Sequence, residues 1–128
     1  PNIVSVSTIY GGNLGWNLSN TLTATLATVA ADKLVKINRI TVANVDGTNA
    51  ANVNLYIDGL TTAGATGFAG TGASATVYIA KTVSVPADAT LVLSDTPIYL
   101  MEGDILKGGA SAASDLDLFI SYEVLDDA

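Results

Sequence analysis

The stretch LDLFISYEV, residues 116–124, decides the fold class, because apolar and polar side chains alternate along it. The apolar positions are Leu116, Leu118, Ile120, Tyr122 and Val124, and the polar positions are Asp117, Ser121 and Glu123. A period of two residues is typical of a β-strand that buries one face and exposes the other. We therefore predict a half-buried antiparallel strand here. Phe119 interrupts the polar face, which makes it a candidate contact with a partner protein.

The same period recurs upstream, where β-branched residues are abundant. TLTATLA, residues 21–27, is predicted to be a second half-buried strand. Its inward residues would be Leu22, Ala24 and Leu26. In KLVKINRITVANV, residues 33–45, the apolar phase slips by one residue at Asn38 and Arg39, which predicts a β-bulge there.

Turn signals separate the predicted strands. Asp46-Gly47 and Asp58-Gly59 flank NVNLYI, residues 52–57, and Asp-Gly pairs favour tight turns, so three strands are predicted to follow one another as a meander. A Gly-rich loop at 59–74, with Phe68 as its one large apolar residue, precedes further short strands. GTGASA, residues 70–75, formally matches a dinucleotide fingerprint, but a loop precedes it and a strand follows it, so no nucleotide site is predicted.

The 128 residues are predicted to form one domain, because a chain of this length builds a single core. We count eight or nine strands with turns every 8 to 12 residues and no helical period. The predicted fold is all-β: a single antiparallel β-sandwich, jelly-roll-like, spanning residues 1–128. Within it we expect an irregular N-terminal segment at 10–20.

Composition excludes several classes of function. The five cationic residues and the formal net charge of -7 cannot supply the basic stripe that binds nucleic acid. The chain has no Cys and no His, which removes thiolate nucleophiles, sulfur-ligated zinc sites and the commonest general base. No stretch approaches the ~20 apolar residues that cross a bilayer. We therefore expect no nucleic-acid or membrane partner, no cofactor and no enzymatic activity.

Two carboxylates flank a glycine in PIYLMEGDIL, residues 97–106. A catalytic pair needs one acid whose pKa is raised by burial or by a like charge. Glu102 and Asp104 lie beside Gly103, a residue suited to a turn, so we interpret them as solvated turn residues that amides could replace. No catalytic residue is assigned.

Other acidic residues could ligate calcium, but they lack the EF-hand spacing. Asp115 and Asp117 share one strand face, which is the usual pattern of a solvated surface, and Asp126 and Asp127 end the chain. We assign no metal ligand, although a weak calcium site stays open as an alternative.

Large apolar side chains in predicted loops are the candidate interface residues. IYGGNLGWNLSN, residues 9–20, holds Tyr10, Leu14 and Trp16, the only tryptophan. Trp16 is either a core plug that closes one end of the sandwich or an anchor for a neighbouring subunit or a sugar, and the sequence leaves both open. The predicted interface is Tyr10, Leu14, Trp16, Phe68 and Phe119.

Two sets of motifs resemble known families. The phrase Leu100-x-x-Gly103-Asp104-x-Leu106, followed by a final amphipathic strand, resembles the turn before a late strand in jelly-roll domains of the C1q and tumour-necrosis-factor-like families, which are typically trimers. Residues 40–59 and 85–124 resemble small structural proteins of tailed bacteriophages, in which VANVDGT, a VPA turn and an EGD turn occur in this order.

The phage resemblance implies a non-enzymatic virion protein, made in the host cytoplasm. The implied role is a capsid decoration or cement protein that binds the major capsid protein or other virion proteins as a homo-oligomer, with a trimer favoured. A neck, tail or fibre accessory protein is the alternative. A carbohydrate-binding or adhesin module is the rival class, and its candidate aromatic residues are Trp16, Tyr10, Tyr56 and Tyr78.

Overall fold

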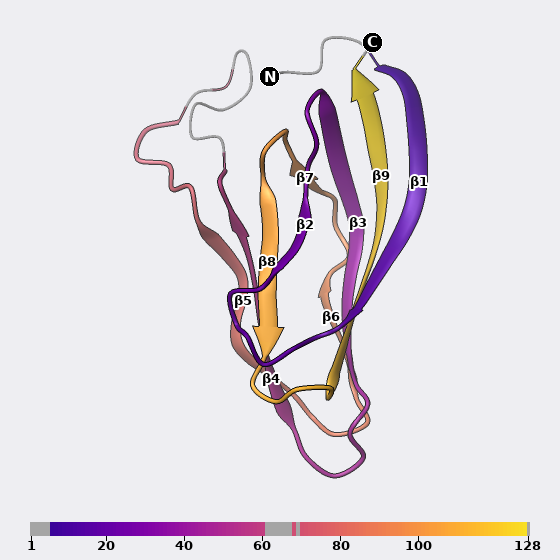
Figure 1. Ribbon diagram of the computed structural model, residues 1–128, viewed down its shortest axis with the longest axis vertical. Helices are drawn as coiled ribbons and strands as arrows, with labels where there is room; N and C mark the ends of the chain where they lie inside the picture. The colour runs from indigo at the N-terminus through magenta and orange to yellow at the C-terminus, as the bar shows by residue number, and fades with distance from the viewer. Residues whose placement is uncertain (1–5, 61–67, 69, 128) are drawn as a thin grey trace.

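The computed structural model describes residues 6–60, 68 and 70–127, and these residues form an antiparallel β-sandwich of two sheets (Figure 1). The strands are β1 (Val6–Asn17), β2 (Thr25–Thr28), β3 (Lys33–Asn44), β4 (Ala51–Asp58), β5 (Val77–Val85), β6 (Thr90–Ser94), β7 (Ile98–Leu100), β8 (Ile105–Ala110) and β9 (Leu116–Asp127). Sheet A has the order β1-β9-β3-β6, with β7 also paired to β3, and sheet B has the order β2-β8-β4-β5. The predicted all-β sandwich of eight or nine strands is confirmed.

The predicted meander is wrong, because consecutive strands mostly change sheets. β3 lies in sheet A, whereas β2 before it and β4 after it lie in sheet B, where both pair with β8. β3 and β4 each have an apolar face, and placing them in opposite sheets buries the two faces against each other. An Asp-Gly pair permits a tight turn but does not decide whether the strands that it joins become neighbours.

β9 is an interior strand of sheet A and carries the predicted alternation into the core. It pairs with β1 on one side and with β3 on the other along nearly its whole length. Leu118 and Ile120 are buried, and they lie opposite Val42 and Ile40 of β3, which are also buried. The main inward residues that sheet B supplies are Val53, Leu55, Ile57 and Leu106.

The predicted β-bulge in β3 is confirmed. The register against β9 shifts between Ile37, which lies opposite Tyr122, and Arg39, which lies opposite Ser121. The extra residue lets both Ile37 and Ile40 point into the core although they are three positions apart.

Two sequence predictions about the first strands are wrong. The segment predicted to be irregular at 10–20 is regular up to Asn17, because β1 pairs continuously with β9 from Thr8 onward. Leu22 was predicted to point inward, but its side chain is 41% exposed, since β2 begins only at Thr25. Period two identifies strand-compatible residues, but a paired neighbour decides which of them form a strand.

Two glycines of β8 allow other segments of backbone to approach this strand closely. A Cβ atom at Gly108 would overlap the carbonyl oxygen of Asn54, and one at Gly109 would overlap that of Thr21. The Gly108 N–H donates to the carbonyl of Ala24 at 3.0 Å, which fixes the connection on β8. The absence of a side chain at Gly108 therefore admits the backbone of β4, and its absence at Gly109 admits the connection between β1 and β2.

Neighbouring residues on β9 test the assignment of its two faces. Ile120→Asp would bury an unpaired carboxylate and is expected to cost more than ~4 kcal/mol, enough to unfold most of the protein. Phe119→Asp is the matched control, because Phe119 points to the opposite face and is 48% exposed. Circular dichroism and urea unfolding measure both variants. A stable, folded Ile120→Asp protein would contradict the face assignment.

Candidate functional site

The EGD turn is structural. It connects β7 to β8, and Gly103 has a φ of +86°, so the predicted glycine turn is confirmed. Glu102 lies beside a second turn, where its Oε2 accepts a hydrogen bond from the Asp32 N–H at 2.6 Å. This N–H lowers the pKa of Glu102, which is opposite to the change that a general acid needs.

Asp104 is not the solvated residue that the sequence predicted, since it is only 1% exposed. Its Oδ2 accepts a hydrogen bond from the Met101 N–H at 2.8 Å, which closes the turn. The backbone also joins this turn to the end of β2, because the Val29 N–H donates to the Asp104 carbonyl and the Gly103 N–H donates to the Val29 carbonyl. Asp104 therefore fixes the place where β2, β7 and β8 meet.

Two of the other acidic residues singled out in the sequence, Asp117 and Asp126, bond to neighbouring side chains. Asp117 accepts a hydrogen bond from Asn17 Nδ2 at 2.7 Å, and Asp126 forms an ion pair with Lys33 at 2.7 Å. Within residues 6–60, 68 and 70–127, no three acidic side chains are grouped so that they could hold a metal ion. The same residues contain no helix long and apolar enough to cross a membrane.

The predicted interface residues lie in three places. Tyr10, Leu14 and Trp16 are alternate residues of β1 and share the inward face of sheet A, opposite Val124, Ile120 and Leu118. Tyr10 is 54% exposed because β1 is the outermost strand of the sheet. Phe119 projects from the other face of the same sheet. Phe68 is exposed, and most of its loop, residues 61–67 and 69, lies outside the described residues.

The sequence left open whether Trp16 is a core plug or an anchor for a partner, and its position has features of both. It is partly buried and packs against the core cluster, beside Leu118 of β9. Truncating it would therefore disturb folding as well as any contact with a partner, so it cannot by itself report on binding. Leu14 and Phe119, which are more exposed, are better probes of an interface.

An uncharged row of residues crosses the outer face of sheet A. It runs from Gly15 on β1 through Phe119 on β9 and Thr41 on β3 to Val92 on β6. Phe119 and Val92 are both exposed. A surface hollow of about 280 Å³ lies beside Phe119, and Gly15 forms part of its wall. The sequence predicted only Phe119 of this row, because the neighbours across the sheet are distant in the chain.

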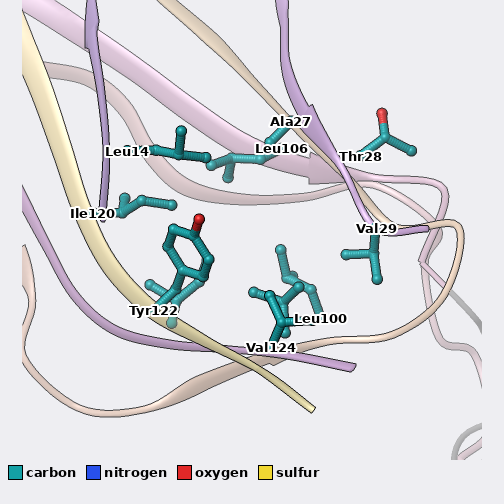
Figure 2. Close-up of a pocket in the computed structure, with 11 residues that line it drawn as sticks. Leu14, Ala27, Thr28, Val29, Leu100, Leu106, Ile120, Tyr122 and Val124 are labelled. Atoms are coloured by element: carbon teal, nitrogen blue, oxygen red, sulfur yellow. The ribbon is translucent and has the colours of Figure 1, made fainter. Parts of the chain in front are cut away.

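An apolar cavity of about 200 Å³ lies between the two sheets, near their β1 and β2 edges (Figure 2). Its wall is aliphatic apart from Thr28 and Tyr122, whose ring Figure 2 shows inside the cluster with the hydroxyl directed toward Leu14 and Leu106. A Cβ atom at Gly12 would lie 2.8 Å from the Tyr122 hydroxyl oxygen, so this glycine gives the ring its space. No local sequence pattern indicated the cavity.

The aromatic residues proposed for sugar binding do not form one platform. Tyr56 and Tyr78 stack on the outer face of sheet B with ring centroids 4.8 Å apart, and Lys81 lies 5.3 Å from the Tyr78 centroid. Tyr56 is buried. Tyr10 and Trp16 belong to the other sheet, so a sugar could stack on Tyr78 or on Tyr10 but not on all four.

Comparisons of the chain with protein-family models, with curated proteins and with solved structures gave no significant match. A proposal about its function is therefore argued from the residues of the chain itself.

Substitutions of Glu102 and Asp104 in the EGD turn test the structural roles given to these two acids. Asp104→Ala is expected to destabilise the protein by about 1–3 kcal/mol, because it leaves the partly buried Met101 N–H without its acceptor. Glu102→Gln should have a smaller effect, since an amide oxygen can still accept from the Asp32 N–H. Urea unfolding at neutral pH measures both. Equal stabilities of wild type and Asp104→Ala would contradict the role given to Asp104.

A second test uses the pH dependence of stability through Asp58, at the end of β4. Hydrogen bonds from Thr76 first, then from Lys107 and the Gly59 N–H, lower the pKa of Asp58. A lowered folded-state pKa stabilises the protein fully above the unfolded value of about 3.9, and this contribution is lost as the pH falls through the folded value. The contribution is modest because both partners of the ion pair are partly exposed.

Asp58→Asn should therefore lower the urea midpoint at neutral pH and lose that difference near pH ~2. Asp95→Asn, a change to an exposed acid between β6 and β7, is the control and should shift the midpoint less at neutral pH. If the difference in urea midpoint between wild type and Asp58→Asn grew on acidification, the direction given for the pKa shift of Asp58 would be wrong.

Proposed function

We propose that the protein is a non-enzymatic structural component of a bacteriophage virion, and specifically a capsid decoration or cement protein that stabilises the head by binding between capsid subunits. Its partners would be the major capsid protein or other virion proteins. A neck, tail or fibre accessory role is the alternative, because the same kind of contact surface would serve there.

The observation that carries this proposal is the uncharged row Gly15, Phe119, Thr41 and Val92 on the outer face of sheet A. In a chain with a net charge of -7, an uncharged row with two exposed apolar side chains is suited to a contact that does not depend on charge. The hollow beside Phe119 could receive one large side chain of a partner, and such anchors supply much of the energy of an interface.

The resemblance to phage structural proteins also supports the proposal, and two of the resembling stretches form one unit at an end of the sandwich. The Asn44 N–H donates to the Ala89 carbonyl at 2.8 Å, and the Asp88 N–H donates to the Asp46 carbonyl at 3.2 Å. The VANVDGT and VPA turns thus hold each other in place. The EGD turn fixes the opposite end, near the start of β8 (Figure 1).

Rebinding to phage heads assembled without this protein tests the function. The double variant Phe119→Ser Val92→Ser should bind such heads at least tenfold more weakly than wild type, since a single anchor is worth ~2 kcal/mol. Wild-type binding should persist at about 0.5 M salt, because the row is uncharged and the acid in the wall of the hollow, Asp117, is already bonded to Asn17. Tyr99→Ser, which removes another exposed aromatic side chain of the same sheet, is the matched control.

Each variant should first be shown to keep the circular dichroism and melting temperature of the wild type. Equal rebinding of the double variant would reject the outer row as the contact. Binding of the wild type to isolated tails, with none to heads, would reject the decoration role in favour of the tail alternative.

A further inference from the structure

The edges of the two sheets differ in how well they are protected against pairing with another chain. An edge strand exposes unpaired N–H and C=O groups, and proteins shield such edges by keeping them short, bulged or charged. β2 forms one edge of sheet B, and β6 and β7 together form the edge of sheet A beyond β3; these strands are only four, five and three residues long. β5 is longer, but its register against β4 shifts twice, Thr82 has a φ of 54°, and Lys81 adds a charge.

β1 is protected only at its start, where its register against β9 shifts between Val6 and Thr8. It is 12 residues long and contains no charged residue and no proline. Its ladder with β9 is continuous from Thr8 to Asn17, and among the described strands it pairs with β9 alone. Figure 1 shows β1 at the outer rim of the sheet, with no strand on its far side.

We propose that β1 pairs antiparallel with β1 of a second copy of this chain, across a two-fold axis at Gly12, so that two sheets A become one continuous sheet. The pairing is isologous, because each copy offers the same strand to the other. This symmetry differs from the trimer that the family resemblance implies. The proposal does not rest on the proposed virion role.

The alternation of side chains restricts the register. Residues that face each other across an antiparallel pair must lie on the same face of the joined sheet, so the two-fold axis must pass through a residue and not between two residues. With the axis at Gly12, Tyr10 lies opposite Leu14 of the second copy, and Ile9 lies opposite Gly15. Both exposed side chains of the inward face, Tyr10 and Leu14, then gain an apolar cross-strand neighbour.

The glycines of β1 fit this pairing. Gly12 is already without a side chain because the Tyr122 ring occupies that space, and it leaves the axis free of clashes. A Cβ atom at Gly11 would meet no other atom within 4 Å, so the packing of one chain does not require a glycine there. Glycine within a strand often marks the close approach of another backbone.

The absence of charge on β1 allows a second copy to approach this strand. The chain carries a net charge of -7, so two copies repel each other over most of their surface. β1 is a long uncharged stretch on which they can approach. A charged partner segment would find no complementary charge on β1, whereas an identical strand offers matching apolar residues and matching backbone groups.

Sedimentation equilibrium at about 100 µM tests the proposal, since weak edge pairing requires a high concentration. We expect twice the 13.0 kDa mass of one chain. The variant Tyr10→Lys Leu14→Lys places like charges directly opposite each other and should be monomeric, as should Tyr10→Glu Leu14→Glu. A mixture of the two variants should restore the dimer, because each lysine then faces a glutamate.

Tyr99→Lys, a change on the opposite edge strand β7, is the control and should leave the dimer intact. If the charged variants fail to fold, hydrogen exchange on the wild type decides: the alternate amides of residues 8–16 that point away from β9 should become more protected as protein concentration rises. A monomeric or trimeric wild type, a dimer unaffected by both charged variants, or exchange independent of concentration would each overturn the proposal.

Discussion

The pairing of β9 with strands on both of its sides is the constraint on which the rest of the structure depends. β9 bonds to β1 and β3 at once, and its alternate residues Leu118 and Ile120 fill the space between the sheets. Since both of its edges are used, β9 fixes the register of sheet A and the outward position of Phe119. It also makes β1 an edge strand, and this position is why Tyr10 and Leu14 are exposed although they point inward.

Buried polar side chains fix the places where the chain changes direction or sheet. Asn44 donates from Nδ2 to the carbonyls of Asn49 and Val85, and Asn54 accepts the N–H of Thr82 at 2.7 Å, where the backbone has a positive φ. Asp104 has the same kind of role in the EGD turn. A buried polar group is tolerated when it satisfies backbone groups that have no strand partner, and these three residues do so at bends.

The cavity and the exposed edge lie close together. Leu14 and Tyr122 line the cavity from sheet A, and Ala27 and Leu106 line it from sheet B. Gly12 admits the Tyr122 ring and at the same time leaves the middle of β1 without a side chain. Gly12 thus serves both the packing of Tyr122 within one chain and the approach of a neighbouring chain to β1.

The sequence alone determined the fold class, the two faces of β9, the bulge at Asn38 and Arg39, and the turn at Gly103. Each of these depends on local chemistry: side-chain alternation, a slip in its phase, or the conformational freedom of glycine. The outward position of Phe119 was predicted in the same way, because it is an apolar residue on a polar strand face.

Only the tertiary structure decided which strands pair, that residues 9–17 form a strand, and that Asp104 is buried. β1 and β9 lie at opposite ends of the chain, and no local pattern specifies a partner so distant in sequence. The burial of Asp104 and the row from Gly15 to Val92 likewise arise where separate segments meet. Alternation fixes which way a side chain points, but the neighbouring strand determines what it meets there.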